Sequence, residues 1–355
     1  MLRHVVWPEW QFRDTEDTKV SDWLRSVQGR QKDDWDVALL GVPLSKTSIT
    51  HSAAFRFPAA VRSVFRSMTP YSVYHALDLR MWLNVADLGD VVMHLTDMNV
   101  CHEHIQDAVQ SYWEFYDAPL VLLGGDHSIT ACAVAGLTDV QQRKIGIVHF
   151  DAHHDVRNLA DGGRHNGTPF RSILESTKVE GSNIVQIGLR DFVNAPSYHE
   201  YVVSKNVRVV TSREVHRRGL NIVLKEAWDE LIRKGVEMVY VSFDLDVLDP
   251  SFAPGVPAPA PGGLSFLECA EALEWLGQQA QVVMLDMVCA DRKRQTKPTW
   301  CLPSCCLKMG SSSIGRFLVC ESTCLTNSVV NFGVNVSLPS TTAASPPVSF
   351  ALSTV

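Results

Sequence analysis

A short acidic and histidine-containing segment at residues 151–155, Asp-Ala-His-His-Asp, most restricts how this chain can fold. It closely follows the apolar residues 145–148, which have the composition of a buried strand in a parallel sheet. Burying an unpaired carboxylate costs several kcal/mol, so such a group needs a partner or a metal ion. Ligands of open α/β sheets bind at the carboxyl ends of the strands. The position and the residue types of the segment therefore predict a metal site at a strand end.

Apolar runs that resemble buried strands alternate with segments of helical periodicity along the chain. We predict strands at residues 36–43, 85–91, 119–123, 145–150, 183–188, 207–210, 238–243 and 282–287. We predict helices that begin near Pro58 and Ser128, and further helices at residues 98–116 and 220–234. This alternation predicts an α/β fold in which helices cover both faces of a mainly parallel sheet.

Composition limits the class of protein. The chain has 355 residues and is 46% hydrophobic, which is enough for a large core. Its net charge of -7 argues against a nucleic-acid partner. No apolar run reaches the roughly 18 residues that span a bilayer, and the first residues lack the apolar core of a signal peptide. We therefore expect a cytoplasmic protein that acts on a small molecule and has no membrane partner.

The chain changes character after Asp291. Residues 295–355 are rich in Ser, Thr and Cys and lack helical periodicity, and five of the nine cysteines lie within residues 301–324. No pair of cysteines has the CxxC spacing of a zinc ribbon or a thioredoxin-like site. We predict a folded domain at residues 1–291 and an atypical, disordered tail at residues 292–355.

Three predicted strands are followed by residues that can bind metal. Residues two apart in an extended segment point the same way, so we expect the acidic and histidine side chains of each segment to converge. Two imidazoles and four carboxylates exceed the needs of one divalent ion, and their oxygen-rich chemistry favours manganese over zinc. We therefore predict two Mn²⁺ ions, which can together activate a water molecule. The expected ligands are His127, Asp151, His153, Asp155, Asp244 and Asp246.

The same segments carry a resemblance to a known family. Residues 124–128 (Gly-Gly-Asp-His-Ser), 151–155 and 242–250 (Ser-Phe-Asp-Leu-Asp-Val-Leu-Asp-Pro) resemble the ureohydrolase signatures of arginases, agmatinases and formimidoylglutamases. The resemblance extends from about Gly41 to Asp291 and includes Asp-Leu-Gly-Asp at residues 87–90. It implies a three-layer α/β/α arginase-like fold, hydrolysis of a C–N bond in a guanidino or formimino group, and a homo-oligomer, either a trimer or a hexamer.

The resemblance also implies how the ligands are shared. One manganese ion would bind His127, Asp151, Asp155 and Asp244. The other would bind Asp151, His153, Asp244 and Asp246. Asp151 and Asp244 would therefore bridge the two ions, while His154 matches no ligand position.

The loop at residues 157–171 bears on the substrate. Arginases and agmatinases carry His-Gly where this chain has Asn166-Gly167, and His165 is displaced by one position. This part of the loop resembles formimidoylglutamase, which produces glutamate and formamide in histidine degradation. We expect Asn166 to contact the substrate, Asp155 to orient the attacking hydroxide, and His165 or a water molecule to pass a proton to the leaving nitrogen.

Three arginines in this loop support the same substrate class. Arginine binds carboxylates through two parallel hydrogen bonds, and N-formimino-L-glutamate carries two carboxylates. We expect Arg157, Arg164 and Arg171 to bind them. Two alternatives remain open. One is an agmatinase or another hydrolase of guanidino compounds. The other is a catalytically impaired metal-binding relative, because Cys289 occupies the place of a glutamate that the family uses to contact the amidine-like group.

Overall fold

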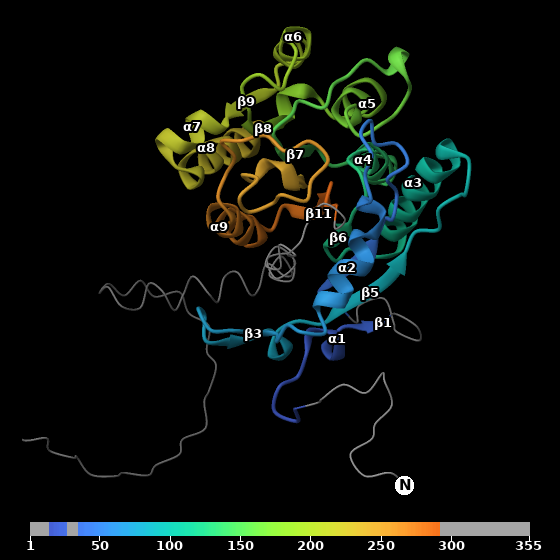
Figure 1. Ribbon diagram of the computed structural model, residues 1–355, viewed down its shortest axis with the longest axis vertical. Coiled ribbons are helices and arrows are strands. Elements are labelled where there is room, and N and C mark those ends of the chain that lie inside the picture. Colours follow the sequence, from blue (N-terminus) through green and yellow to red (C-terminus); the bar gives the residue numbers. More distant parts are fainter. Residues whose placement is uncertain (1–13, 27–34, 292–355) are drawn as a thin grey trace, which may run out of the picture.

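The central element of the computed structural model, which describes residues 14–26 and 35–291, is a nine-stranded parallel sheet (Figure 1). From one edge to the other its strands are β1 (Arg25–Ser26), β5 (Val85–Asp90), β2 (Val37–Gly41), β6 (Leu120–Leu123), β11 (Val282–Val288), β10 (Met238–Asp244), β7 (Ile145–Phe150), β8 (Ile184–Leu189) and β9 (Arg208–Thr211). The eight predicted strands are confirmed, and the short edge strand β1 was not predicted. A separate antiparallel hairpin pairs β3 (Tyr71–Ser72) with β4 (Leu77–Asp78).

The apolar runs form strands because the sheet is buried on both faces. Every residue of β7 is buried. Ile145 and Ile147 contribute to the core on one face, and Val148 and Phe150 contribute to the core on the other. This division explains why the run is continuously apolar instead of alternating with polar residues.

Two layers of helices cover the sheet, which confirms the three-layer α/β/α arrangement (Figure 1). One core contains residues of α3 (Met98–Phe115), α4 (Ser128–Val140), α5 (Pro169–Ser176) and α6 (Pro196–Ser204). The opposite core contains residues of α1 (Val20–Trp23), α2 (Phe57–Val64), α7 (Ser212–Arg218), α8 (Leu220–Arg233) and α9 (Phe266–Gly277). The predicted helices at residues 98–116 and 220–234 correspond to α3 and α8.

Local sequence signals fix several helix starts. Ser265 and Glu268 form a capping box at the start of α9, in which each side chain binds the backbone N–H of the other residue. At the start of α3, the Asp97 side chain accepts hydrogen bonds from the N–H groups of Asn99 and Val100. These contacts supply partners for N–H groups that the helix itself leaves free.

The order of the strands brings distant parts of the sequence together at the carboxyl-terminal ends of the central strands. β6 and β10 both pair with β11, and β10 also pairs with β7. Because the strands are parallel, the residues that follow β6, β7 and β10 all lie at the same end of the sheet, where these strands finish. These are the segments that carry the predicted metal ligands.

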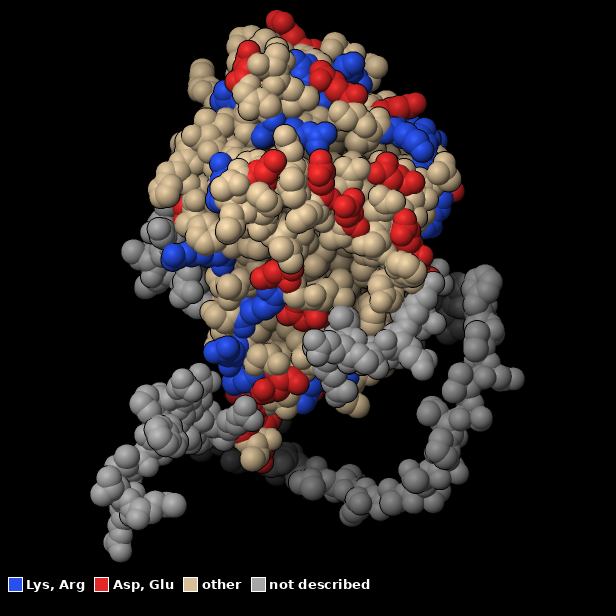
Figure 2. All heavy atoms as spheres, turned by 90° about the vertical axis from the view of Figure 1, so that its right-hand side faces the viewer, with Lys and Arg blue, Asp and Glu red and all other residues tan. Residues whose placement is uncertain are grey.

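Charged side chains of both signs are mixed on one face of the molecule. On the face shown in Figure 2, Lys and Arg side chains are interspersed with Asp and Glu instead of forming a continuous basic area. Among the described helices, none has the length and apolar character needed to cross a membrane. The predicted tail at residues 292–355 lies outside the described residues.

Candidate metal centre

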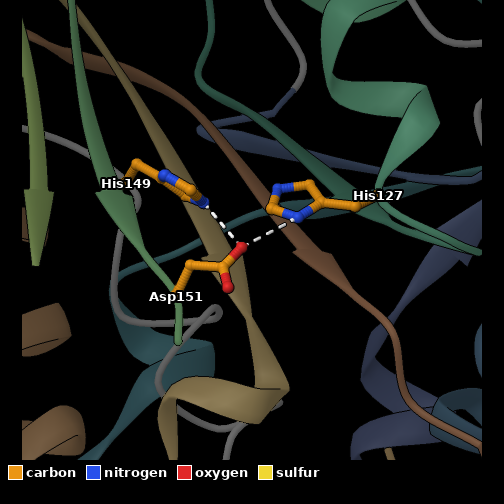
Figure 3. A group of neighbouring side chains, drawn as sticks. All are labelled: His127, His149 and Asp151. Carbon is orange, nitrogen blue, oxygen red and sulfur yellow. Dashed lines mark hydrogen bonds and ion pairs between the residues drawn. The ribbon is translucent and has the colours of Figure 1, made fainter. Parts of the chain in front are cut away.

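Three carboxylates surround the imidazole of His127 at the carboxyl-terminal ends of the central strands. Its Nδ1 atom lies 3.1 Å from Asp151 Oδ2, 2.9 Å from Asp155 Oδ2 and 3.1 Å from Asp244 Oδ2. Figure 3 shows the carboxylate of Asp151 between the rings of His127 and His149. The side chain of His127 is completely buried, so water does not separate these groups. We name these four residues the His127 half of the centre.

The second predicted histidine organises a neighbouring group. His153 Nδ1 lies 3.0 Å from Asp246 Oδ2 and 3.3 Å from Asp151 Oδ1. Asp151 therefore presents one carboxylate oxygen to His127 and the other to His153. The structure thus brings all six predicted ligands together, and the carboxylate of Asp151 lies between the two histidines.

The hydrogen bonds behind His127 show that the site suits a cation. Ser242 donates its hydroxyl hydrogen to Asp286 Oδ1 at 2.9 Å, since a carboxylate can only accept. Ser242 Oγ must then accept from His127 Nε2, which lies 3.0 Å away. Nδ1 then faces the three carboxylates. Burial alone would lower the pKa of His127, but Asp151, Asp155 and Asp244 outweigh it and raise that pKa well above its usual value, so a proton occupies this position in the metal-free protein. A metal ion would replace this proton and bind the Nδ1 atom together with the carboxylate oxygens.

Ionisation of the ligands also suits a bound cation. Burial and the neighbouring Asp151 raise the pKa of Asp155 to about 6. Burial and the neighbouring Asp246 and Asp151 raise the pKa of Asp244 to about 8. Burial lowers the pKa of His153, but the carboxylates of Asp246 and Asp151 outweigh it and raise that pKa to about 12. In the metal-free protein, protons partly neutralise the group, and a bound cation would displace them.

The ligands converge through turns, so the predicted extended backbone is wrong. Asp155 has a φ of 52°, in the left-handed region, and its carbonyl accepts the N–H of Phe170 at 3.0 Å. After Asp244 the chain enters the 3₁₀ turn Leu245–Val247, and the Asp244 side chain accepts the N–H of Asp246. The last strand-type backbone hydrogen bonds of the first segment are those from Asp151 to Ile187 at 3.0 Å and from Arg190 to Ala152 at 3.1 Å, so the chain is free to turn after Ala152.

Close packing explains the two glycines before Asp126. A Cβ atom on Gly125 would lie 1.6 Å from the carbonyl oxygen of Leu44, and one on Gly124 would lie 2.7 Å from that of Met287. Only glycine permits this approach. The Asp126 backbone N–H then donates to the Leu44 carbonyl at 2.7 Å. The next residue, His127, is thereby fixed at the end of β6.

A row of polar side chains crosses the sheet just below the ligands and was missed in the sequence. Gln186 pairs in register with His149, His149 with Ser242, and Ser242 with Asp286, on the adjacent strands β8, β7, β10 and β11. We name these four residues the polar row, and all are completely buried. Each interrupts an apolar run, which is the signal that could have revealed them.

Arg190 is a second residue that the sequence analysis missed. Its guanidinium is buried and donates to the carbonyl oxygens of Gly188 and Asp246 at 2.8 and 2.9 Å. The carboxylate of Asp246 in turn accepts the N–H of Ala152 at 3.0 Å. These contacts tie the segments after β7, β8 and β10 into one rigid assembly.

Cys289 lies beside the His127 half. It is buried, and its Sγ atom belongs to a group of possible metal-binding atoms, all within 4.8 Å of one another, that includes His127 and Asp244. Burial, followed by Asp244 and Asp246, raises the pKa of its thiol well above the usual value. The thiol is therefore protonated near neutral pH in the metal-free protein.

Several of the predicted substrate residues line a cavity of about 590 Å³, whereas none of the six predicted metal ligands is among its lining residues. Lys46, Arg157, Arg164, His102 and His165 are among the residues that line it. Thr47 also lines it and donates to Asp126 Oδ2 at 2.7 Å, which connects the cavity to the residue before His127. Lys46 and His102 were not predicted. The wall of the cavity carries three cationic side chains and one carboxylate, that of Asp161.

Two predicted substrate residues lie elsewhere. Arg171 forms an ion pair with Glu175, with Nε 3.3 Å from Oε1, and its guanidinium lies 3.7 Å from the centre of the Tyr201 ring. Asn166 accepts the N–H of Ile49 at 2.9 Å through its side-chain oxygen. Neither residue is among those that line the cavity. Asn166 instead orders the loop that carries Lys46 and Thr47.

Comparison with known proteins assigns the family. The model of the arginase family matches residues 35–298. The chain belongs to the arginase family. It is 40% identical to formimidoylglutamase of Halalkalibacterium halodurans over 282 residues, which are 79% of this chain and 86% of the relative. It is 36% identical to formimidoylglutamase of Bacillus subtilis over 284 residues, which are 79% of this chain and 86% of the relative.

A solved structure agrees with this family. The crystal structure of formimidoylglutamase from Bacillus subtilis superimposes with a TM-score of 0.81 at 33% identity, covering 88% of this chain and 96% of that one. Arginase-family enzymes depend on metal ions, and the residues gathered at this sheet edge suit such an ion. The family resemblance and the arginase-like fold expected from the sequence are therefore confirmed.

Proposed function

We propose that this chain is a formimidoylglutamase, which hydrolyses N-formimino-L-glutamate to L-glutamate and formamide in histidine degradation. The observation that carries the proposal is the cavity lined by Lys46, Arg157 and Arg164, which Thr47 connects to Asp126, the residue before the predicted ligand His127. The names of the two bacterial relatives support it.

The charges of the cavity suit this substrate. Lys46, Arg157 and Arg164 provide three cationic side chains against the one carboxylate of Asp161, and the substrate carries two carboxylates. Agmatine carries no carboxylate and is itself a cation, so the same wall would repel it. We propose that Arg157 and Arg164 bind the carboxylates, with Lys46 as an additional contact. Arg171 would act indirectly, through α5, and Asn166 through the loop at residues 46–49.

We propose that the centre holds two Mn²⁺ ions. His127, Asp151, Asp155 and Asp244 would hold one, and Asp151, His153, Asp244 and Asp246 the other. This donor set of four carboxylates and two imidazoles, without an obligatory thiolate, favours manganese. When bound, the ions lower the pKa of water and so supply a nucleophile at neutral pH.

The chain's own residues would direct the reaction. Asp155 would orient the nucleophile toward the formimino carbon. Burial and the nearby Arg157 lower the pKa of His165, which is therefore neutral at pH 7. Its Nδ1 accepts the N–H of Gly167 at 3.1 Å, so its proton is on Nε2. A neutral imidazole is too weak an acid to release that proton, so the N–H of His165 would orient a water molecule, which would relay the proton of the nucleophile to the leaving nitrogen.

Turnover assays test the proposal. The purified protein with Mn²⁺ is offered formiminoglutamate, agmatine, arginine and guanidinobutyrate, and formamide and urea are measured separately. We expect formamide from the first substrate and little urea from the others. Urea from a guanidino compound at a higher kcat/KM would instead identify a guanidino hydrolase. No turnover by a folded, metal-loaded sample would identify an impaired relative, as Cys289 would suggest.

We also propose that the enzyme is cytoplasmic and forms a trimer or a hexamer, as the family resemblance implies. Light scattering coupled to size exclusion measures the assembly directly. A monomer at micromolar concentration would contradict this part of the proposal.

A further inference from the structure

His149 is a buried histidine that is not among the predicted ligands but touches one. Its Nε2 lies 2.8 Å from Asp151 Oδ2, the oxygen that faces His127 (Figure 3). Its ring stacks on Phe170 with the centroids 3.8 Å apart. An imidazole ring that accepts a hydrogen bond at one nitrogen carries its hydrogen on the other nitrogen. Which nitrogen carries the hydrogen decides whether His149 supports Asp151 or repels it.

The contacts of Gln186 show which nitrogen of His149 carries the hydrogen. Its Nε2 atom lies 2.9 Å from the backbone carbonyl oxygen of His154, which can only accept a hydrogen bond. The amide group must therefore turn its NH₂ toward that carbonyl. The same NH₂ group lies 3.1 Å from His149 Nδ1, which must accept. The hydrogen of His149 is consequently on Nε2 and is donated to Asp151.

The other end of the amide agrees with this orientation. Gln186 Oε1 lies 2.6 Å from His154 Nδ1, which donates to it. His154 Nε2 then carries the lone pair and faces Nδ1 of the exposed His199 at 3.2 Å. Were the amide reversed, its oxygen would lie 2.9 Å from the carbonyl oxygen of His154, which is also an acceptor. This fixed contact allows one orientation of the amide only, and the two histidine tautomers follow from it.

We infer that Gln186 is a positioning residue, which fixes the tautomer of His149 so that His149 donates to Asp151 and holds this carboxylate between the two halves of the centre. The inference rests on the metal centre of the proposed function and not on its substrate. It assigns His149 to the support of a ligand, although its position beside His127 and Asp151 would also allow it to bind metal. Mutation of a residue that hydrogen-bonds to a metal ligand typically weakens metal affinity 10–100-fold.

Two variants of Gln186 test the inference. Gln186→Leu removes the donor, and Gln186→Glu keeps the shape but places a carboxylate, which can only accept, beside His149 Nδ1. Gln106→Leu is the matched control, because the Gln106 amide binds Asp139 at the surface, at 2.8 Å. The tautomer of His149 is read from its ¹⁵N shifts in metal-free protein, with its signals assigned by their loss in His149→Phe. The Mn²⁺ dissociation constant is measured by calorimetry.

We expect the wild type and Gln106→Leu to show His149 protonated on Nε2 alone. Gln186→Leu should lose this preference and bind Mn²⁺ about 10–100-fold more weakly, and Gln186→Glu should show a proton on Nδ1. If Gln186→Leu fails to fold, the ¹⁵N result for Gln186→Glu decides. Wild-type shifts and wild-type Mn²⁺ affinity in the variants would overturn the inference. Neither measurement uses a substrate, so its failure is distinct from failure of the proposed function.

Discussion

Ser242→Ala tests whether the hydrogen bonds behind the metal centre matter as the structure implies. The hydroxyl of Ser242 accepts from His127 and donates to Asp286. Its loss leaves Asp286 with three other donors, Thr130 and Tyr240 at 2.6 Å and the N–H of Phe243 at 3.2 Å. The N–H of His127 loses its acceptor in a completely buried position.

The expected loss of stability follows from the two hydrogen bonds that the substitution removes. A hydrogen bond to a charged group contributes about 1.5–3 kcal/mol, and a buried donor without a partner costs about 1–3 kcal/mol. Since both losses come from one hydroxyl, we expect the unfolding free energy of the metal-free protein to fall by about 2–4 kcal/mol. The freed imidazole can also turn its hydrogen toward the carboxylates. Mn²⁺ affinity should therefore fall about 10–100-fold.

Urea unfolding with EDTA measures the first effect, and calorimetric titration with Mn²⁺ measures the second. Ser172→Ala is a matched control, because Ser172 is also buried and its hydroxyl has no hydrogen-bond partner among the described residues. That substitution should leave stability and metal affinity nearly unchanged. If the two variants behave alike, the proposed role of Ser242 in orienting His127 is refuted.

Three further predictions follow from the site. Asp244→Ala should abolish activity and reduce bound Mn²⁺ below two equivalents per chain while the fold persists, as metal analysis and circular dichroism can check; two retained equivalents would exclude a bridging role. Arg157→Ala should weaken formiminoglutamate binding by about 1.5–3 kcal/mol, seen as a raised KM with unchanged metal content, whereas Arg80→Ala, in a surface ion pair with Asp78, should leave KM alone. The stability of the metal-free protein should fall as pH rises from about 4 to 8, because folding raises the pKa of Asp155 and Asp244 from 3.8 to about 6 and about 8, so the folded state binds more protons in this window. Over the same pH range Mn²⁺ should bind more tightly, since the protons that it displaces are already lost. Urea unfolding in EDTA measures how stability changes with pH, and calorimetric titration measures how Mn²⁺ affinity changes with pH. If stability and Mn²⁺ affinity changed in the same direction, the raised pKa values of Asp155 and Asp244 would be contradicted.

The sequence predicts the strands well because each central strand is buried on both faces and is largely apolar. It also predicts the ligands, because charged residues directly after a buried strand need a partner or a metal ion. It did not predict which members of the polar row pair with one another. His149 and Gln186 are 37 residues apart and Ser242 and Asp286 are 44 apart, so each pair becomes visible only when the strand order is known.

The sequence also did not predict the directions in which several side chains point. The convergence of Asp151 with Asp155 depends on a left-handed residue that no local pattern requires. Arg171 lies in the first turn of α5, and the orientation of that helix directs its side chain to Tyr201 instead of the cavity. Such directions follow from tertiary packing, which residue types alone do not specify.

The place of β11 in the sheet has a consequence for how the protein folds. This strand comes last in the described chain, yet it lies between β6 and β10 and pairs with both. During synthesis, the segments that carry His127 and Asp244 therefore lack the strand that joins them until residues 282–288 have emerged from the ribosome. Pairing between strands so distant in sequence is slow, because a long loop must close before contacts compensate for it. The metal centre thus forms only when the sheet is complete, and metal binding would mark the end of folding.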